Sequence, residues 1–223
     1  MTDQLVRVGG RSVPMTTARC WIGDYFDAAR NRDSPHPFAY PAYDRYRSGS
    51  TADELNDGDL MAPALLNVRP SLAAFYGLQS IRKELEAGLA ATPASVALGV
   101  AVKDDTLNDR IRSFVGVLDA GAPRGVKLTT LTKVLHRKRP AFMPLHDQYV
   151  RACYLGSAAP YPVRRSKARS WVDYWAEMAS AMHRDLETQP TQWADLAASA
   201  GAYVSPLRVL DVVAWKTGRV GGA

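Results

Sequence analysis

The chain has 223 residues, of which 47% are hydrophobic and 22% charged, a composition typical of a soluble globular protein with one large domain or two lobes. It has no run of 18 apolar residues, no signal-like apolar stretch near its first residue and only two cysteines, which argues against a spanning helix, secretion, a disulfide framework and a cysteine-bound cluster. The expected location is therefore the cytoplasm, and the net charge of +6 with a pI of about 9.4 indicates an anionic partner.

The predicted elements, in chain order, begin with a short hairpin or ordered arm over residues 5–13 and an amphipathic helix over residues 16–29. Residues 33–51, with three prolines and three tyrosines, are predicted to form an irregular loop. Apolar residues at helical spacing predict further helices over residues 57–66, 70–89, 104–118, 129–136, 147–154, 171–186, 192–200 and 206–215.

These patterns predict an all-α fold in one compact unit of two-lobed architecture. We expect an N-terminal helical lobe over residues 1–103, a lobe with a hairpin and Asp147 over 104–160, and C-terminal helices over 161–223.

The positive charge is concentrated in residues 120–169, where eleven lysines and arginines accompany a single acid, Asp147. This window carries a net charge of +10, which leaves −4 for the rest of the chain. The cations are Arg124, Lys127, Lys133, Arg137, Lys138, Arg139, Arg151, Arg164, Arg165, Lys167 and Arg169. So local an excess indicates a face that binds phosphates, although a solvated arginine-rich surface without a partner is the alternative.

Within this window, the stretch GVKLTTLTKVLHRKRPAFMPLHDQYVRACY (residues 125–154) has a glycine turn, a short apolar helix, a Pro-X-X-Asp and a second helix. In this order and spacing it resembles the helix-hairpin-helix DNA glycosylases. Gly125 aligns with the first hairpin glycine, Thr130 with a threonine of the next helix, and Pro144 and Asp147 with the proline and the catalytic aspartate. The 22 positions from Gly125 to Asp147 match the usual interval of that family. The KRP-X-X-X-P-X-X-D stretch also resembles that of an uncharacterised bacterial family.

The resemblance implies a metal-free, cofactor-free glycosylase that acts on a flipped base, with DNA as its partner. Lys127 replaces the second hairpin glycine, and Thr129 stands where bifunctional members have a nucleophilic lysine, so a monofunctional enzyme is expected unless Lys133 substitutes. Asp147 is the expected catalytic residue. The expected DNA contacts are Gly125, Lys127, Thr130, Lys133, His136, Arg137, Lys138, Arg139 and Arg151.

The residue types suit this chemistry. Cleavage of an N-glycosidic bond develops positive charge on the sugar, which a carboxylate stabilises while it orients the attacking water. The alternative for Asp147 is a helix N-cap, worth about 1 kcal/mol. The run from His136 to Arg139 contacts phosphates or only complements a helix C-terminus.

A flipped base also requires flat side chains around it. Tyr40, Tyr43 and Tyr46 are the stacking candidates, with ordinary packing as the alternative, whereas Trp171 and Trp175 are expected in the core. No metal-ligand spacing is found.

Two other functions fit the same residues. A non-catalytic DNA-binding module would keep the hairpin and bind in a salt-dependent way. An enzyme acting on a nucleoside or another small anion would have a deep pocket at Asp147 without a continuous basic groove leading to it.

Overall fold

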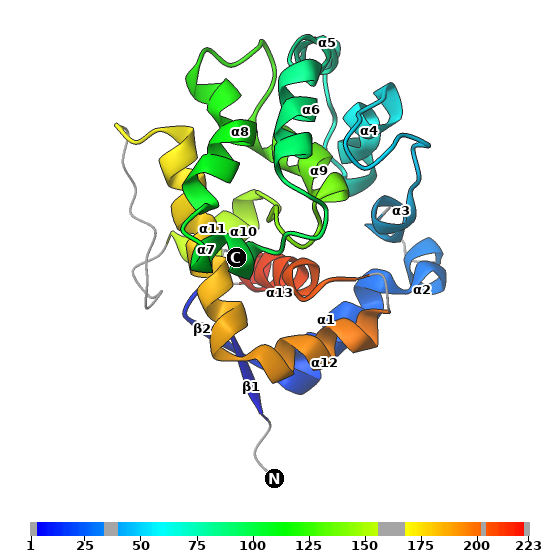
Figure 1. Ribbon diagram of the computed structural model, residues 1–223. Coiled ribbons are helices and arrows are strands. Elements are labelled where there is room, and N and C mark those ends of the chain that lie inside the picture. Colours follow the sequence, from blue (N-terminus) through cyan, green and yellow to red (C-terminus); the bar gives the residue numbers. More distant parts are fainter. Residues whose placement is uncertain (1–3, 34–39, 156–167, 202–203, 221–223) are drawn as a thin grey trace.

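A computed structural model describes residues 4–33, 40–155, 168–201 and 204–220, and it confirms the predicted compact all-α fold (Figure 1). The one sheet in this part of the chain is an antiparallel hairpin of β1 (Leu5–Val8) and β2 (Arg11–Pro14), in which Val6 pairs with Val13. The turn needs Gly9 and Gly10, which both have positive φ angles. Of the two alternatives for residues 5–13, the hairpin is therefore the correct one.

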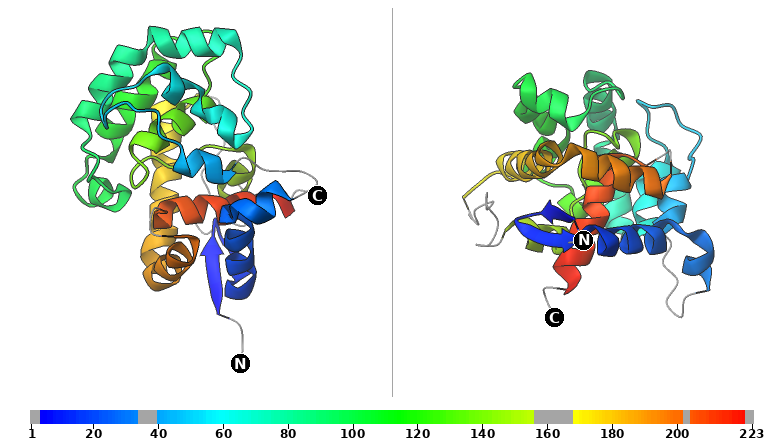
Figure 2. Two further views of the ribbon diagram at one scale, coloured as in Figure 1. Left: turned by 90° about the vertical axis from the view of Figure 1, so that its right-hand side faces the viewer. Right: turned by 90° about the horizontal axis from the view of Figure 1, so that it is seen from below.

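The first group of helices brings together helices from near the start and near the end of the sequence. This terminal group consists of α1 (Met15–Phe26), α10 (Gln148–Tyr154), α12 (Pro190–Ala200) and α13 (Pro206–Val220). Helix α1 packs on α12 and α13, and α10 packs on α13. The crossing of α10 and α13 is so close that a Cβ at Gly218 would overlap the carbonyl oxygen of Tyr149. Two views of Figure 2 show these helices together beside the hairpin.

The second group, here called the hairpin group, lies on the other side of the molecule (Figure 1). It consists of α4 (Asp57–Met61), the 3-10 helix η1 (Ala62–Leu66), α5 (Leu72–Ser80), α6 (Arg82–Ala91), α8 (Leu107–Asp119) and α9 (Leu128–Lys138). Helix α6 packs on α8, and α9 packs on α4, η1 and α8.

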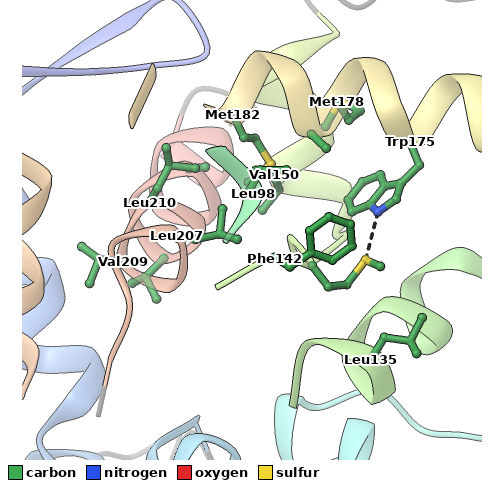
Figure 3. Close-up of a cluster of buried hydrophobic side chains, with 14 of the residues drawn as sticks. Leu98, Leu135, Phe142, Val150, Trp175, Met178, Met182, Leu207, Val209 and Leu210 are labelled. Carbon is green, nitrogen blue, oxygen red and sulfur yellow. Dashed lines mark hydrogen bonds between the residues drawn. The ribbon is translucent and has the colours of Figure 1, made fainter. Parts of the chain in front are cut away.

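The long helix α11 (Trp171–Thr188) connects the two groups, because it packs on α7 (Leu98–Lys103) and α8 along one part and on α13 along another. Its Trp175 is fully buried, as expected, and the indole N–H lies 3.2 Å from the sulfur of Met143 (Figure 3). Trp171, in contrast, is 45% exposed. One apolar core runs through both groups.

Three local predictions were wrong. The predicted loop contains helix α3 (Tyr40–Arg45), and α2 (Ala28–Arg32) precedes it. The predicted helix over residues 70–89 is broken at Ile81 into α5 and α6, and α7 was not expected. Short helices carry too few apolar repeats to be recognised by periodicity. No helix of the described residues is both long and apolar enough to span a bilayer.

Candidate active site

The turn between α8 and α9 forms a helix–turn–helix unit. Gly125 has a φ of +82°, and a Cβ there would lie 2.8 Å from the backbone nitrogen of Ala74, so both the turn and the contact with α5 require glycine. Lys127 is the exposed N-cap residue of α9. The predicted glycine turn is therefore present between two helices, and Lys127 beside it faces solvent.

Asp147 is the N-cap residue of α10. Its carboxylate accepts a hydrogen bond of 2.8 Å from the backbone N–H of Tyr149 and remains half-buried. The capping role is thus present. It leaves the second carboxylate oxygen open to other contacts, because the cap uses one oxygen only.

Asp147 borders a small cavity where the two helix groups meet, here called the Asp147 pocket. Lys133 of α9 and Leu66 of η1 contribute from the hairpin group. Its full lining is Tyr25, Leu66, Lys133, Leu145, Asp147, Arg208, Asp211, Val212 and Trp215. The volume of about 40 Å³ admits a few water molecules and excludes a nucleobase.

Four charged side chains surround this cavity. Burial lowers the pKa of the Lys133 ammonium, which donates a 3.2 Å hydrogen bond to the carbonyl of His146. Arg208 donates to both carboxylate oxygens of Asp44, at 2.8 and 2.9 Å, and also to Asp211. Burial raises the pKa of Asp211 to about 6. A carboxyl that titrates near neutrality beside a second carboxylate is suited to proton transfer.

Most of the cations predicted to contact phosphates point into the protein instead. Arg139 is completely buried, and its guanidinium donates to the carbonyls of Leu89, Thr92 and Ala52 and to the carboxylate of Asp53. The prediction for Arg139 was therefore wrong. The cause is the unpaired carbonyls at the end of α6 and in the loop before α4, which need donors.

The same correction applies to its neighbours. His136 is buried, its Nδ1 donates to Met143, and burial lowers its pKa to about 4, so the ring is neutral at pH 7. Lys138 forms an ion pair of 3.1 Å with Asp59. Thr130 and Lys133 are also buried. None of these four side chains forms part of an external phosphate-binding face.

Arg137 is half-buried and donates to the carbonyls of Tyr43 and Tyr46 at 2.5 and 2.6 Å. The predicted contacts that do face solvent are Gly125, Lys127 and Arg151, together with Arg124 of the charged window. Arg164, Arg165 and Lys167 lie outside the described residues.

The tyrosines that were predicted to stack on a base also contact other parts of the protein. Tyr43 is buried and its hydroxyl donates to the carbonyl of Lys133 at 2.7 Å, so its prediction as a base-stacking residue was wrong. The ring of Tyr46 is covered by Arg137, whose guanidinium carbon lies 4.9 Å from the ring centre. The side chain of Tyr40 lies outside the described residues.

Thr129 is hydrogen-bonded to His146 at 2.9 Å, and the other ring nitrogen of His146 lies 3.3 Å from the hydroxyl of Tyr174. Burial lowers the pKa of His146 to about 3, so this histidine is a neutral link in a polar chain.

Sequence reasoning did not select Tyr25, Arg208, Asp211 and Trp215, which complete the Asp147 pocket. A signal was present in residues 207–215, LRVLDVVAW, because Arg208 and Asp211 stand three positions apart in an otherwise apolar stretch. Such a pair is buried only when its members bind each other or another charge. In the described residues, His, Cys, Asp and Glu side chains nowhere form a group of three that could hold a metal ion.

Comparison with known proteins gives one finding. No curated protein and no solved structure matches the chain. A family model described as "Family of unknown function (DUF6308)" matches residues 18–218, which include every described element from α1 to α13 apart from the first and last few residues. The chain therefore belongs to this family of unknown function, DUF6308.

Proposed function

We propose that the protein hydrolyses an N-glycosidic bond at the Asp147 pocket. The observation that supports this most is the position of the Asp147 carboxylate, which borders a cavity of water size at the junction of the two helix groups. The attacking water would occupy this cavity, and the sugar would bind at its open side, where the carboxylate stabilises the developing positive charge.

The neighbouring groups fit the same reaction. Asp211, with a pKa of about 6, would exchange a proton during the cycle, since such a group is present in both forms near neutral pH. Lys133 and Arg208 bring positive charge to the pocket. Trp215, which is half-buried, supplies aromatic surface against which a sugar could pack.

The distribution of cations favours a nucleoside or a single nucleotide as the substrate. A pocket is present at Asp147, whereas Lys133, His136, Lys138 and Arg139, which a basic groove leading to it would need, are turned inward. An enzyme that acts on a small substrate was expected to have a deep pocket at Asp147 and no basic groove leading to it. The inward orientation of these cations fits that expectation, whereas the pocket is only of water size.

A DNA glycosylase is the second candidate. The exposed turn at Gly125, with Arg124 and Lys127 beside the N-terminus of α9, supports it, because cationic side chains at a helix N-terminus suit a backbone phosphate. Asp147 would have the same role in this enzyme, and the substrate base would be flipped out of the duplex.

The test is release of free base, followed by chromatography, from a panel of nucleosides, nucleotides and duplexes with damaged bases. We expect Asp147→Asn to fold, because asparagine caps a helix as well as aspartate does, and to lose activity by about 100-fold or more through loss of the charge. The matched control is Asp109→Asn, which changes an exposed acid in the first turn of α8.

If no member of the panel yields free base, the enzymatic proposal fails. Salt-dependent binding of duplex DNA without base release would instead support a non-catalytic DNA-binding protein. Full activity of Asp147→Asn would remove Asp147 from the mechanism.

A further inference from the structure

A second and larger cavity, here called the basic pocket, is also lined by Arg208. Its volume is about 470 Å³, within the range of sites that hold small molecules. Its walls come from α3, the loop of residues 47–52, the end of α9 and the start of α13. These segments are far apart in the sequence, so only the folded chain creates the cavity.

The basic pocket is lined by more cationic than anionic side chains. Four cationic side chains line it, Arg47, Arg137, Lys138 and Arg208, against one carboxylate, Asp44. Three serines and a threonine add aliphatic hydroxyl groups, namely Ser48, Ser50, Thr51 and Ser205.

Two of the four cations are already paired with acids. Arg208 binds Asp44 and Asp211, and Lys138 binds Asp59. Arg137 gives its terminal donors to two backbone carbonyls, and Arg47 donates to the carbonyl of Tyr46 at 3.1 Å. Neither Arg137 nor Arg47 has a carboxylate within ion-pair distance among the described residues. Within the part of the chain that the structure describes, the pocket therefore has two positive charges without a matching acid.

We propose that the basic pocket binds a small molecule through its phosphate monoester group. Arg47 would contact the phosphate directly, since its exposed guanidinium keeps free donors, and Arg137 would contribute charge from the wall. The cavity is larger than inorganic phosphate alone requires, which favours a phosphate carried by a small organic body. This site is separate from the proposed hydrolysis and does not depend on it.

The experiment measures the thermal unfolding midpoint of the full chain during titration with ribose 5-phosphate, inorganic phosphate or ribose, with sodium chloride holding ionic strength constant. We expect ribose 5-phosphate to raise the midpoint, inorganic phosphate to do so more weakly, and ribose to have no effect. Arg47→Ala should weaken the apparent affinity by about tenfold or more, as loss of a charge-assisted contact does, and Arg47→Lys should restore part of it.

Arg112→Ala is the control, because Arg112 is an exposed arginine of α8 outside the pocket. Arg137→Gln tests the second cation of the pocket that lacks a matching acid among the described residues. If that variant does not fold, Arg47→Ala still tests the proposal. Equal stabilisation of wild type and Arg47→Ala, or no stabilisation beyond that by sodium chloride, would overturn the proposal. So would a loss of duplex DNA affinity in Arg47→Ala without any response of the wild type to ribose 5-phosphate, since the cations would then serve nucleic acid.

Discussion

Removal of the Arg139 side chain gives the sharpest test of the inward orientation of the α9 cations. All five N–H donors of the guanidinium are used: Nε binds the Thr92 carbonyl, Nη1 binds Ala52 and Lys138, and Nη2 binds Leu89 and Asp53. Since no donor is left for a phosphate, Arg139 has a structural role. It joins the end of α6 to the loop before α4.

The magnitude follows from these contacts. Arg139→Ala leaves the carbonyls of Leu89 and Thr92 buried without this donor, and it removes a completely buried charge that holds several groups. Breaking such an arrangement costs about 4 kcal/mol in the free energy of unfolding. A domain with an unfolding free energy of about 5–15 kcal/mol would lose a large fraction of its stability. Arg139→Lys should recover only part of it, because an ammonium cannot reproduce the planar fork.

The assay is equilibrium unfolding in urea, with Arg112→Ala as the control for loss of an exposed arginine, for which a change within about 0.5 kcal/mol is expected. A phosphate contact would behave in the opposite way, with unchanged stability and weaker DNA binding. If Arg139→Ala lost less than about 1 kcal/mol relative to this control, the structural explanation of Arg139 would be refuted.

Two further predictions concern stability. Burial lowers the pKa of His136 from 6.5 to about 4, so the unfolded chain binds the extra proton between these values and acidification from pH 6.5 to 4 should lower the unfolding free energy by about 3 kcal/mol for this residue. Asp211, with its raised pKa, increases the unfolding free energy as the pH falls from 6 to 4 and so opposes the effect of His136. The contribution of His136 is therefore isolated by comparing the slope of unfolding free energy against pH between His136→Gln and wild type. Identical slopes would contradict the lowered pKa of His136. Gly218→Ala should cost more than about 2 kcal/mol by clashing with Tyr149, whereas Gly23→Ala, which meets no neighbour, should be neutral or stabilising; equal melting temperatures would mean a looser crossing of α10 and α13.

The sequence predicted long amphipathic helices such as α8 and α11 well, because many apolar residues repeat along each. It also predicted the glycine turn at Gly125 and the N-cap position of Asp147, since both depend on local chemistry. It did not predict that α1 packs on α12 and α13, since that contact joins distant parts of the chain. The grouping of helices requires knowledge of tertiary contacts that periodicity does not contain.

The direction of the α9 cations could not be predicted for a related reason. A dense run of charges along the chain indicates how many cations are close together, and says nothing about which backbone carbonyls lack donors in the fold. Helix α3 supplies such a carbonyl at Tyr43, and the loop after it supplies two more at Thr51 and Ala52. Arg137, Lys138 and Arg139 bind these three carbonyls. What resembled a surface for an external anion is, in large part, a set of internal donors.

The same reasoning bears on Asp147. A buried cation needs an opposite charge near it, and Asp147 favours the charged form of the buried Lys133, so part of its role is electrostatic balance inside the protein. Asp211 also acts on Lys133, however, and Lys133 has a backbone acceptor in His146, so balance alone does not require a second acid. Capping of α10 also explains the position of this half-buried carboxylate, and its place beside a cavity of water size is what makes a further, catalytic role testable. Loss of base release in Asp147→Asn with little change in stability would separate that action from capping and charge balance.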